Sequence, residues 1–126
     1  MQEIETAFKS LSESINNIDI KSLPSIKLTE YHSVDKLTTS PAIYFIYHDS
    51  YGLMYIGKAV SLRKRFYVTR DSYGRVQEEK CHDALVKALQ LKNCTLYYLV
   101  IKKEYITILE SILLQNKVPL WNKNLI

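Results

Sequence analysis

Two short apolar segments that flank a turn constrain the fold of this chain more than any other feature. Residues 42–47 (Ala-Ile-Tyr-Phe-Ile-Tyr) and 53–56 (Leu-Met-Tyr-Ile) are rich in the β-branched and aromatic side chains that favour strands. Between them, Asp49, Ser50 and Gly52 are typical turn residues. The sequence therefore predicts a β-hairpin with its turn near Ser50.

The other predicted elements cover this hairpin. Residues 94–101 are predicted to form a third apolar strand, and the chain after Pro119 is expected to run extended. Residues 25–39 are mixed and polar, and a short strand and one helical turn are open there. Four segments carry hydrophobic side chains at helical spacing: residues 4–18, 58–67, 83–91 and 104–116. The predicted fold class is α+β, with a small three-stranded, largely antiparallel sheet flanked by helices and an extra N-terminal helix.

The length of the chain, 126 residues, is enough for one domain with its own core. We place that domain at residues 41–126 and assign residues 1–40 to an N-terminal helix and a lead-in segment. Two cysteines are too few for a disulfide framework, and the N-terminus is polar rather than a secretory signal. A cytoplasmic protein without a membrane partner, either a monomer or a homodimer, is expected.

Basic residues are concentrated in one stretch of the chain. The net charge is +4, and residues 58–75 contain six lysines and arginines but a single acidic residue, Asp71. A basic patch on a nearly neutral protein favours a polyanionic partner, most simply nucleic acid, whereas a solvated, charged helix face would explain the same charges. The candidate nucleic-acid contacts are Arg63, Lys64, Arg70 and Arg75.

Several polar side chains can meet beside the hairpin. Tyr44 and Tyr55 can lie across from each other on one face, although two packed core aromatics fit the same pattern. Gly57 is expected to end the second strand and to let another backbone or a phosphate come close. Lys58 and Arg65 are seven positions apart, so on one helix they would share a face close to Tyr55.

Glu110 lies in a predicted helix that is apolar nearly all round. Ile106 and Leu113 flank it on its own face. A carboxylate in such a place is costly unless it is paired or binds a metal, so a salt bridge and a metal ligand are both open. Asn122, just after Pro119, can reach back as a polar supporting group.

Taken in order, these residues resemble the GIY-YIG nuclease superfamily. The pattern covers residues 41–122 and reads Ile43-Tyr44, Tyr55-Ile56-Gly57-Lys58, Arg65, Glu110 and Pro119-x-x-Asn122. Residues 53–65 are especially similar to the nuclease domain of the excision-repair subunit of that family. Each triplet alone is a weak signal, but the ordered set is specific.

The resemblance implies an endonuclease that hydrolyses phosphodiester bonds in DNA with one divalent ion, Mg²⁺ or Mn²⁺, and RNA stays open as a partner. A guanidinium and a cation suit the negative charge that develops on phosphorus-bound oxygens. The implied roles are water activation or positioning by Tyr44 and Tyr55, a neighbouring lysine at Lys58, phosphorane stabilisation by Arg65, the sole protein metal ligand at Glu110, and bracing by Asn122. Lys58 and Arg65 are expected to lower the pKa of the neighbouring tyrosine.

Two positions depart from the family pattern. The first glycine of the first triplet is Ala42, which an extended backbone tolerates. Many relatives carry a histidine or tyrosine one turn after the arginine, where this chain has Thr69, which is not a general base at neutral pH. His82, Tyr67 and Tyr73 are the candidates for that role. The alternative to a nuclease is a catalytically weak or inactive nucleic-acid-binding module with the same fold.

Overall fold

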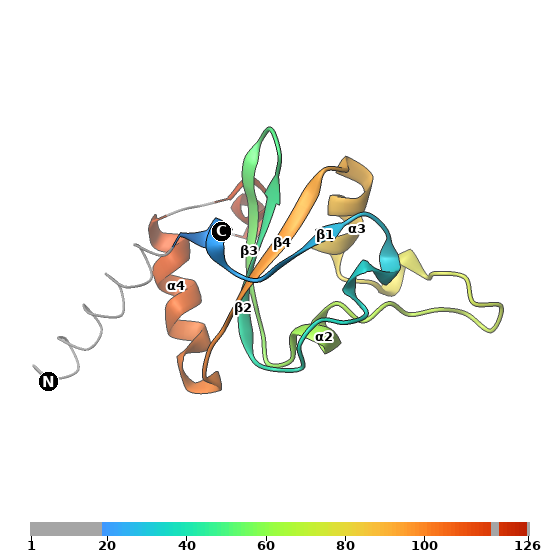
Figure 1. Ribbon diagram of the computed structural model, residues 1–126, viewed down its shortest axis with the longest axis horizontal. Helices are drawn as coiled ribbons and strands as arrows, with labels where there is room; N and C mark the ends of the chain where they lie inside the picture. Colours follow the sequence, from blue (N-terminus) through green and yellow to red (C-terminus); the bar gives the residue numbers. More distant parts are fainter. Residues whose placement is uncertain (1–18, 117–118, 126) are drawn as a thin grey trace, which may run out of the picture.

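A four-stranded antiparallel sheet forms the centre of the fold, which a computed structural model describes for residues 19–116 and 119–125 (Figure 1). Its strand order is β1-β4-β2-β3. The strands are β1 (Ser25–Leu28), β2 (Ala42–His48), β3 (Gly52–Ala59) and β4 (Cys94–Val100). The α+β class agrees with the sequence prediction. The expectation of three strands was wrong, because the short, half-polar segment β1 pairs with β4.

The hairpin of β2 and β3 has its turn at residues 49–51, as predicted. Its register pairs Tyr44 with Gly57 and Ile46 with Tyr55. The two tyrosines therefore share a face but lie diagonally, two positions apart, rather than directly opposite. Gly57 does not end the strand, because β3 continues through Lys58, which pairs with β2.

Three α-helices flank the sheet within the described residues: α2 (Leu62–Arg65), α3 (Asp83–Leu91) and α4 (Ile106–Asn116). Short 3₁₀ turns complete the fold: η1 (Ile20–Ser22), η2 (Tyr31–Val34), η3 (Glu78–Lys80), η4 (Lys103–Tyr105) and η5 (Leu120–Leu125). The predicted helices at 83–91 and 104–116 are present, the second beginning as η4. The helix predicted over residues 4–18 lies outside the described residues.

Two other predicted segments take different forms. In place of a helix over residues 58–67 there is the end of β3 followed by the single turn α2. Pairing with β2 keeps Lys58 extended, and a helix begins only after Ser61, whose side chain accepts a hydrogen bond from the backbone N–H of Lys64. Lys58 and Arg65 therefore do not share a helix face. The chain after Pro119 is not extended but forms η5.

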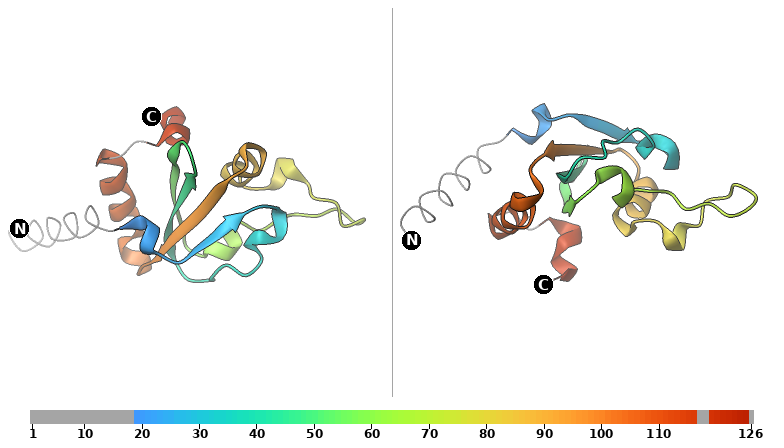
Figure 2. Two further views of the ribbon diagram at one scale, coloured as in Figure 1. Left: turned by 45° about the horizontal axis from the view of Figure 1, so that its top comes forward. Right: turned by 90° about the horizontal axis from the view of Figure 1, so that it is seen from below.

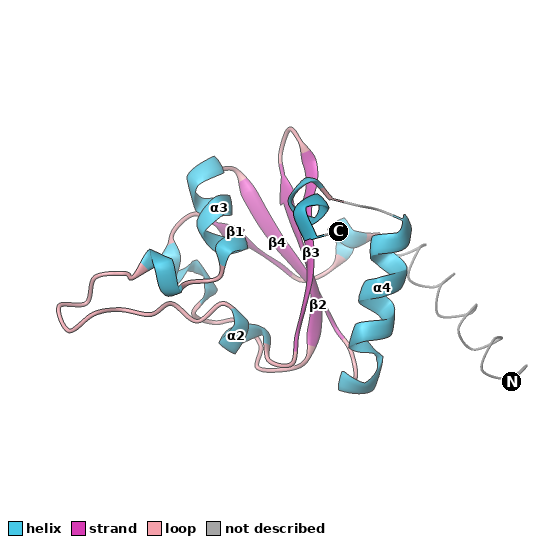
Figure 3. Ribbon diagram, turned by 180° about the vertical axis from the view of Figure 1, so that it is seen from behind, coloured by secondary structure: helices cyan, strands magenta, loops and turns pink. Residues whose placement is uncertain are grey.

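The two faces of the sheet carry separate hydrophobic cores, because side chains alternate along each strand. The face that carries Tyr44 packs against α2 and α3, and the face that carries Phe45 packs against α4. Figure 3 shows α3 on one side of the strands and α4 on the other. Residues that we assigned to a lead-in segment belong to the first core through Leu28, so the sheet continues across residue 40.

A long loop joins α2 to α3 and projects from the rest of the molecule (Figures 1 and 2). Its two arms meet at an isolated antiparallel bridge between Arg70 and Val76. No helix in the described ranges is both long enough and apolar enough to cross a membrane.

Candidate active site

Tyr44, Tyr55 and His82 form an aromatic cluster on one face of the sheet. The hydroxyl oxygen of Tyr44 lies 2.6 Å from Nε2 of His82. The ring centroid of Tyr55 lies 5.9 Å from that of Tyr44 and 5.9 Å from that of His82. Phe66, just after α2, packs against Tyr44 at 4.9 Å and against His82 at 5.1 Å. Packing against Phe66 thus holds Tyr44 and His82, the polar pair of the cluster, in place.

Gly57 leaves the room that the ring of Tyr44 needs. A Cβ built on Gly57 would overlap the ring carbon Cζ of Tyr44. The two residues are register partners, so the ring lies across β3 at a position without a side chain. We expected Gly57 to admit a backbone or a phosphate. That interpretation was wrong, because the ring of Tyr44 fills the space.

His82 is held at the start of α3 by its own backbone. It is the residue before the first helical turn, and its carbonyl accepts hydrogen bonds from the N–H groups of Leu85 and Val86 at 3.0 and 3.2 Å. This anchoring orients the imidazole towards Tyr44. Of the three candidates for the position of Thr69, His82 is the one that contacts a motif tyrosine, whereas Tyr67 and Tyr73 are 69% and 81% exposed.

Asn122 ties the C-terminal turn η5 to strand β3. Its Oδ1 accepts a hydrogen bond from the N–H of Ile56 at 2.9 Å, and its Nδ2 donates to the Ile56 carbonyl at 3.0 Å. The side chain is buried. Because Ile56 lies between Tyr55 and Gly57, these two bonds fix the part of β3 that borders the aromatic cluster.

Glu110 on α4 forms an ion pair with Lys58 on β3. Nζ of Lys58 lies 3.6 Å from Oε1 of Glu110 and donates a hydrogen bond to Oγ1 of Thr107 at 3.2 Å. The Glu110 side chain is only 20% exposed. Sequence reasoning missed Thr107, although it precedes Glu110 by three positions and so shares its helix face.

Arg65, at the end of α2, is exposed. Within residues 19–116 and 119–125 it makes no ion pair or side-chain hydrogen bond. Its charge nevertheless acts on both members of the polar pair, Tyr44 and His82. The guanidinium is therefore close to the cluster and open to an anion.

Burial dominates the acid–base behaviour of Tyr44. It raises the pKa of this phenol well above the usual value of about 10. The neighbouring charges of Tyr55 and Glu110 add to the rise, and Arg65 opposes it. We expected Lys58 and Arg65 to lower the pKa of the tyrosine. For Tyr44 that expectation was wrong, because desolvation outweighs the positive charge.

Burial also governs His82, in the opposite direction. Burial and, to a smaller extent, the charge of Arg65 lower the pKa of His82 to about 4, against the opposing charge of Asp83. At neutral pH the imidazole is therefore neutral and the phenol of Tyr44 is protonated. The tautomer of His82 sets the direction of the hydrogen bond: Tyr44 donates to Nε2 when the imidazole carries its proton on Nδ1, and Nε2 donates to the phenol oxygen in the other tautomer.

The four candidate nucleic-acid contacts are all exposed but are not equally available. Nε of Arg63 donates to a backbone carbonyl at 2.7 Å. Nε of Arg75 lies 3.2 Å from Oδ2 of Asp71. Lys64 and Arg70 make no ion pair in the described part of the chain, so they are the more available of the four.

Glu110 offers a carboxylate for a cation at the border of the cluster. A hard ion such as Mg²⁺ takes oxygen ligands and keeps several waters, so one half-buried carboxylate suits its chemistry. The ammonium of Lys58 lies on the Oε1 side, and a cation would have to share or displace it. Groups of three or more histidine, cysteine or acidic side chains fit to hold an ion do not occur among the residues described.

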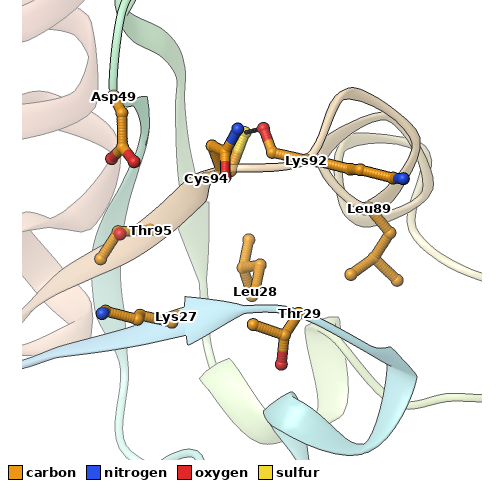
Figure 4. Close-up of a pocket in the computed structure, with 9 residues that line it drawn as sticks. Lys27, Leu28, Thr29, Asp49, Leu89, Lys92, Cys94 and Thr95 are labelled. Atoms are coloured by element: carbon orange, nitrogen blue, oxygen red, sulfur yellow. Dashed lines mark hydrogen bonds between the residues drawn. The ribbon is translucent and has the colours of Figure 1, made fainter.

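A separate cavity of about 400 Å³ lies between β1, β4 and the end of α3. Lys27, Asp49, Lys92 and Cys94 are among the residues that line it (Figure 4). The candidate active-site residues do not line this cavity.

The aromatic cluster, Arg65 and the Lys58–Glu110 pair thus gather around one end of the β2–β3 hairpin. The arrangement joins a neutral imidazole, a buried phenol, an open guanidinium and a carboxylate. Comparisons of the chain with protein-family models, with curated proteins and with solved structures gave no match.

Proposed function

We propose that this protein is a metal-dependent endonuclease of the GIY-YIG type that hydrolyses phosphodiester bonds in DNA. One observation carries the proposal: four side chains from separate elements surround or act on the hydroxyl of Tyr44. His82 forms a hydrogen bond with it, the ring of Tyr55 packs beside the ring of Tyr44 in a tilted arrangement, and the charges of Arg65 and Glu110 act on the pKa of Tyr44. Packing of a hydrophobic core requires none of these polar groups.

The polar pair supports proton transfer from a water molecule. Because the phenol of Tyr44 is protonated, Tyr44 can take a proton from water only as it passes its own proton to Nε2 of His82, which requires the tautomer of His82 with its proton on Nδ1. Arg65 disfavours the imidazolium of His82 that results. A phosphodiester bound to Arg65 would neutralise that charge, so substrate binding would make His82 a better base.

Charge stabilisation falls to Arg65 and to the cation. A guanidinium without a protein partner can make two parallel hydrogen bonds to phosphoryl oxygens. A divalent ion held by Glu110 would supply Lewis-acid stabilisation of the phosphoryl group. Lys58, which pairs with Glu110 at 3.6 Å, would orient the carboxylate before the ion binds.

Nicking of supercoiled plasmid tests the proposal. We expect nicking in Mg²⁺ or Mn²⁺ and none in EDTA. Glu110→Gln should abolish nicking without changing the melting temperature, because the amide keeps the volume but loses the charge. Glu104→Gln is the matched control, since Glu104 is an exposed glutamate of η4, just before the same helix. Full activity of Glu110→Gln would remove Glu110 from the site.

The Lys58–Glu110 ion pair favours a second candidate function, nucleic-acid binding without cleavage. The pair satisfies the carboxylate without a metal, and a histidine whose pKa is about 4 is a weak base. This candidate predicts salt-sensitive binding of DNA by the intact protein and no nicking with any divalent ion.

A further inference from the structure

Exposed aromatic side chains lie in the projecting loop between α2 and α3. Tyr67 is 69% exposed and Tyr73 is 81% exposed, although a phenol ring in water forgoes the stabilisation of burial. Tyr51, at the hairpin turn, is similarly exposed at 71%, but its ring stacks on His48 with centroids 4.5 Å apart. Tyr67 has no such ring contact within the described residues.

The tip of this loop is built to present its aromatic ring. Oδ1 of Asp71 accepts hydrogen bonds from the N–H groups of Tyr73 and Arg75 at 2.8 and 2.9 Å. The N–H of Asp71 in turn bonds to the Arg75 carbonyl at 2.9 Å, and Gly74 provides the positive φ of the turn. The guanidinium of Arg75 lies 5.1 Å from the ring centroid of Tyr73. A tyrosine and a cation are thus held together at the tip.

Two surface hollows are lined in part by residues of α2. One, of about 390 Å³, is lined by Val60, Ser61, Lys64 and Arg65. The other, of about 280 Å³, includes Arg63, Tyr67, Arg70 and Asp35 in its lining. Four positive side chains and one acidic side chain therefore line the two hollows.

This alternation of cations and exposed rings fits an unpaired strand better than a duplex. In a duplex the faces of the bases are buried in the stack, so cations alone would account for binding. In an unpaired strand the base faces are free, and aromatic side chains bind them by stacking while cations follow the phosphates.

We propose that the protein binds an unpaired DNA strand across α2, with bases stacked on Tyr67 and Tyr73, so that the phosphodiester presented to Arg65 is single-stranded. The inference that the bound single strand is also cleaved rests on the proposed nuclease function. The binding itself does not, because it needs neither a metal nor the aromatic cluster.

Fluorescence anisotropy in EDTA tests the binding directly. The probes are a labelled DNA oligonucleotide and the duplex formed with its complement, bound to the full chain at one salt concentration. We expect the single strand to bind more tightly, and Tyr67→Ala and Tyr73→Ala each to weaken its binding by about tenfold. Duplex binding should change less than about twofold, because it uses the cations.

Three controls sharpen the result. Tyr67→Phe and Tyr73→Phe keep the ring and should bind like the parent protein. Tyr51→Ala removes a similarly exposed ring at the hairpin turn, at the opposite end of β3 from α2, and should change neither affinity. Tighter binding of an RNA strand of the same sequence would overturn the choice of DNA.

Failure of this inference can be told from failure of the proposed function. Equal affinity for the two probes, or equal losses on both, would overturn the inference even if the protein nicks plasmid. Ring-dependent binding of the single strand would support it even if no divalent ion produces nicking.

Discussion

The side chain of Tyr44 serves the hydrophobic core and the proposed active site together. Its ring meets Phe66 edge-on at 4.9 Å and lies over Gly57, while its hydroxyl bonds to His82 at 2.6 Å. The same burial that fixes the ring keeps the phenol protonated. Tyr44 can therefore donate a hydrogen bond at neutral pH, and its chemistry depends on its acceptor.

Tyr44→Phe isolates the hydroxyl from the ring. We expect it to lower kcat for nicking by about 10²- to 10³-fold, as for loss of one preorganised polar group. The fold should survive, with a cost of about 1–3 kcal/mol for the unpaired Nε2 of His82. Tyr98→Phe is the matched control, because Tyr98 is the register partner of Tyr44 on β4. Equal losses in the two variants would exclude a special role for the Tyr44 hydroxyl.

For the proposed nuclease activity, we expect a pH dependence that follows from the burial of His82. An exposed histidine titrates near 6.5, but His82 should stay neutral until the pH approaches about 4. We expect the nicking rate of the parent to fall along an acid limb near pH 4, not near pH 6.5, and the profile of His82→Gln to lack this limb. A limb near pH 6.5 that His82→Gln removes would show that His82 is not desolvated in the active protein.

The same shift affects stability. The pKa of His82 is lower in the folded chain than in the unfolded chain, so the unfolded chain binds the proton first as the pH falls. The stability due to neutral His82 is therefore complete above about pH 6.5 and is lost as the pH falls towards about 4. The melting temperatures of the parent and of His82→Gln should therefore approach each other as the pH falls over that range.

At the scale of elements, the sequence predicts what depends on local pattern and misses what depends on pairing. The period-two pattern and turn residues located the hairpin, and the helical period located α3 within its observed bounds. Lys58 was assigned to a helix because its neighbours fit a helical spacing. Pairing with β2, which is not local, holds it in β3 instead.

The place of β1 in the sheet and the electrostatics of the site were missed for a related reason. Four half-polar residues form β1, and their strand conformation depends on β4, far away in the sequence. Residue types and spacing placed Tyr44 and Tyr55 on one face. Residue types and spacing could not show that Phe66 and α3 would bury Tyr44 and His82. This burial raises the pKa of Tyr44, whereas we expected a lowered pKa.

The single turn α2 carries two cations with different expected roles, Arg65 in catalysis and Lys64 in DNA binding, and kinetics can separate them. Arg65 acts on the cluster, so Arg65→Ala should lower kcat by about 10²- to 10³-fold with little change in affinity. Lys64 is exposed, and Lys64→Ala should weaken DNA binding while kcat stays near normal. Lys80→Ala, an exposed lysine of η3, should change neither quantity. A pure loss of affinity for Arg65→Ala would contradict its role in the transition state.

At the scale of the whole molecule, the candidate site draws on both sides of the sheet. Tyr44 belongs to the core that packs against α2 and α3, whereas Glu110 comes from α4, which packs on the other core. The two meet around β3, the last strand in the order β1-β4-β2-β3. A site of this kind exists only when both cores are formed, so partial unfolding of either layer should abolish activity.

The position of β3 at the border of the sheet also bears on self-association. A terminal strand with free backbone groups is a template on which strands of other molecules add, and this leads to aggregation. Asn122 occupies both backbone groups of Ile56, and α4 packs alongside the strand. The side-chain amide of Asn122 therefore blocks edge-to-edge pairing at Ile56. We expect Asn122→Ala to scatter light and to bind thioflavin T on warm incubation, whereas Gln115→Ala, which removes an exposed amide of α4, should stay clear.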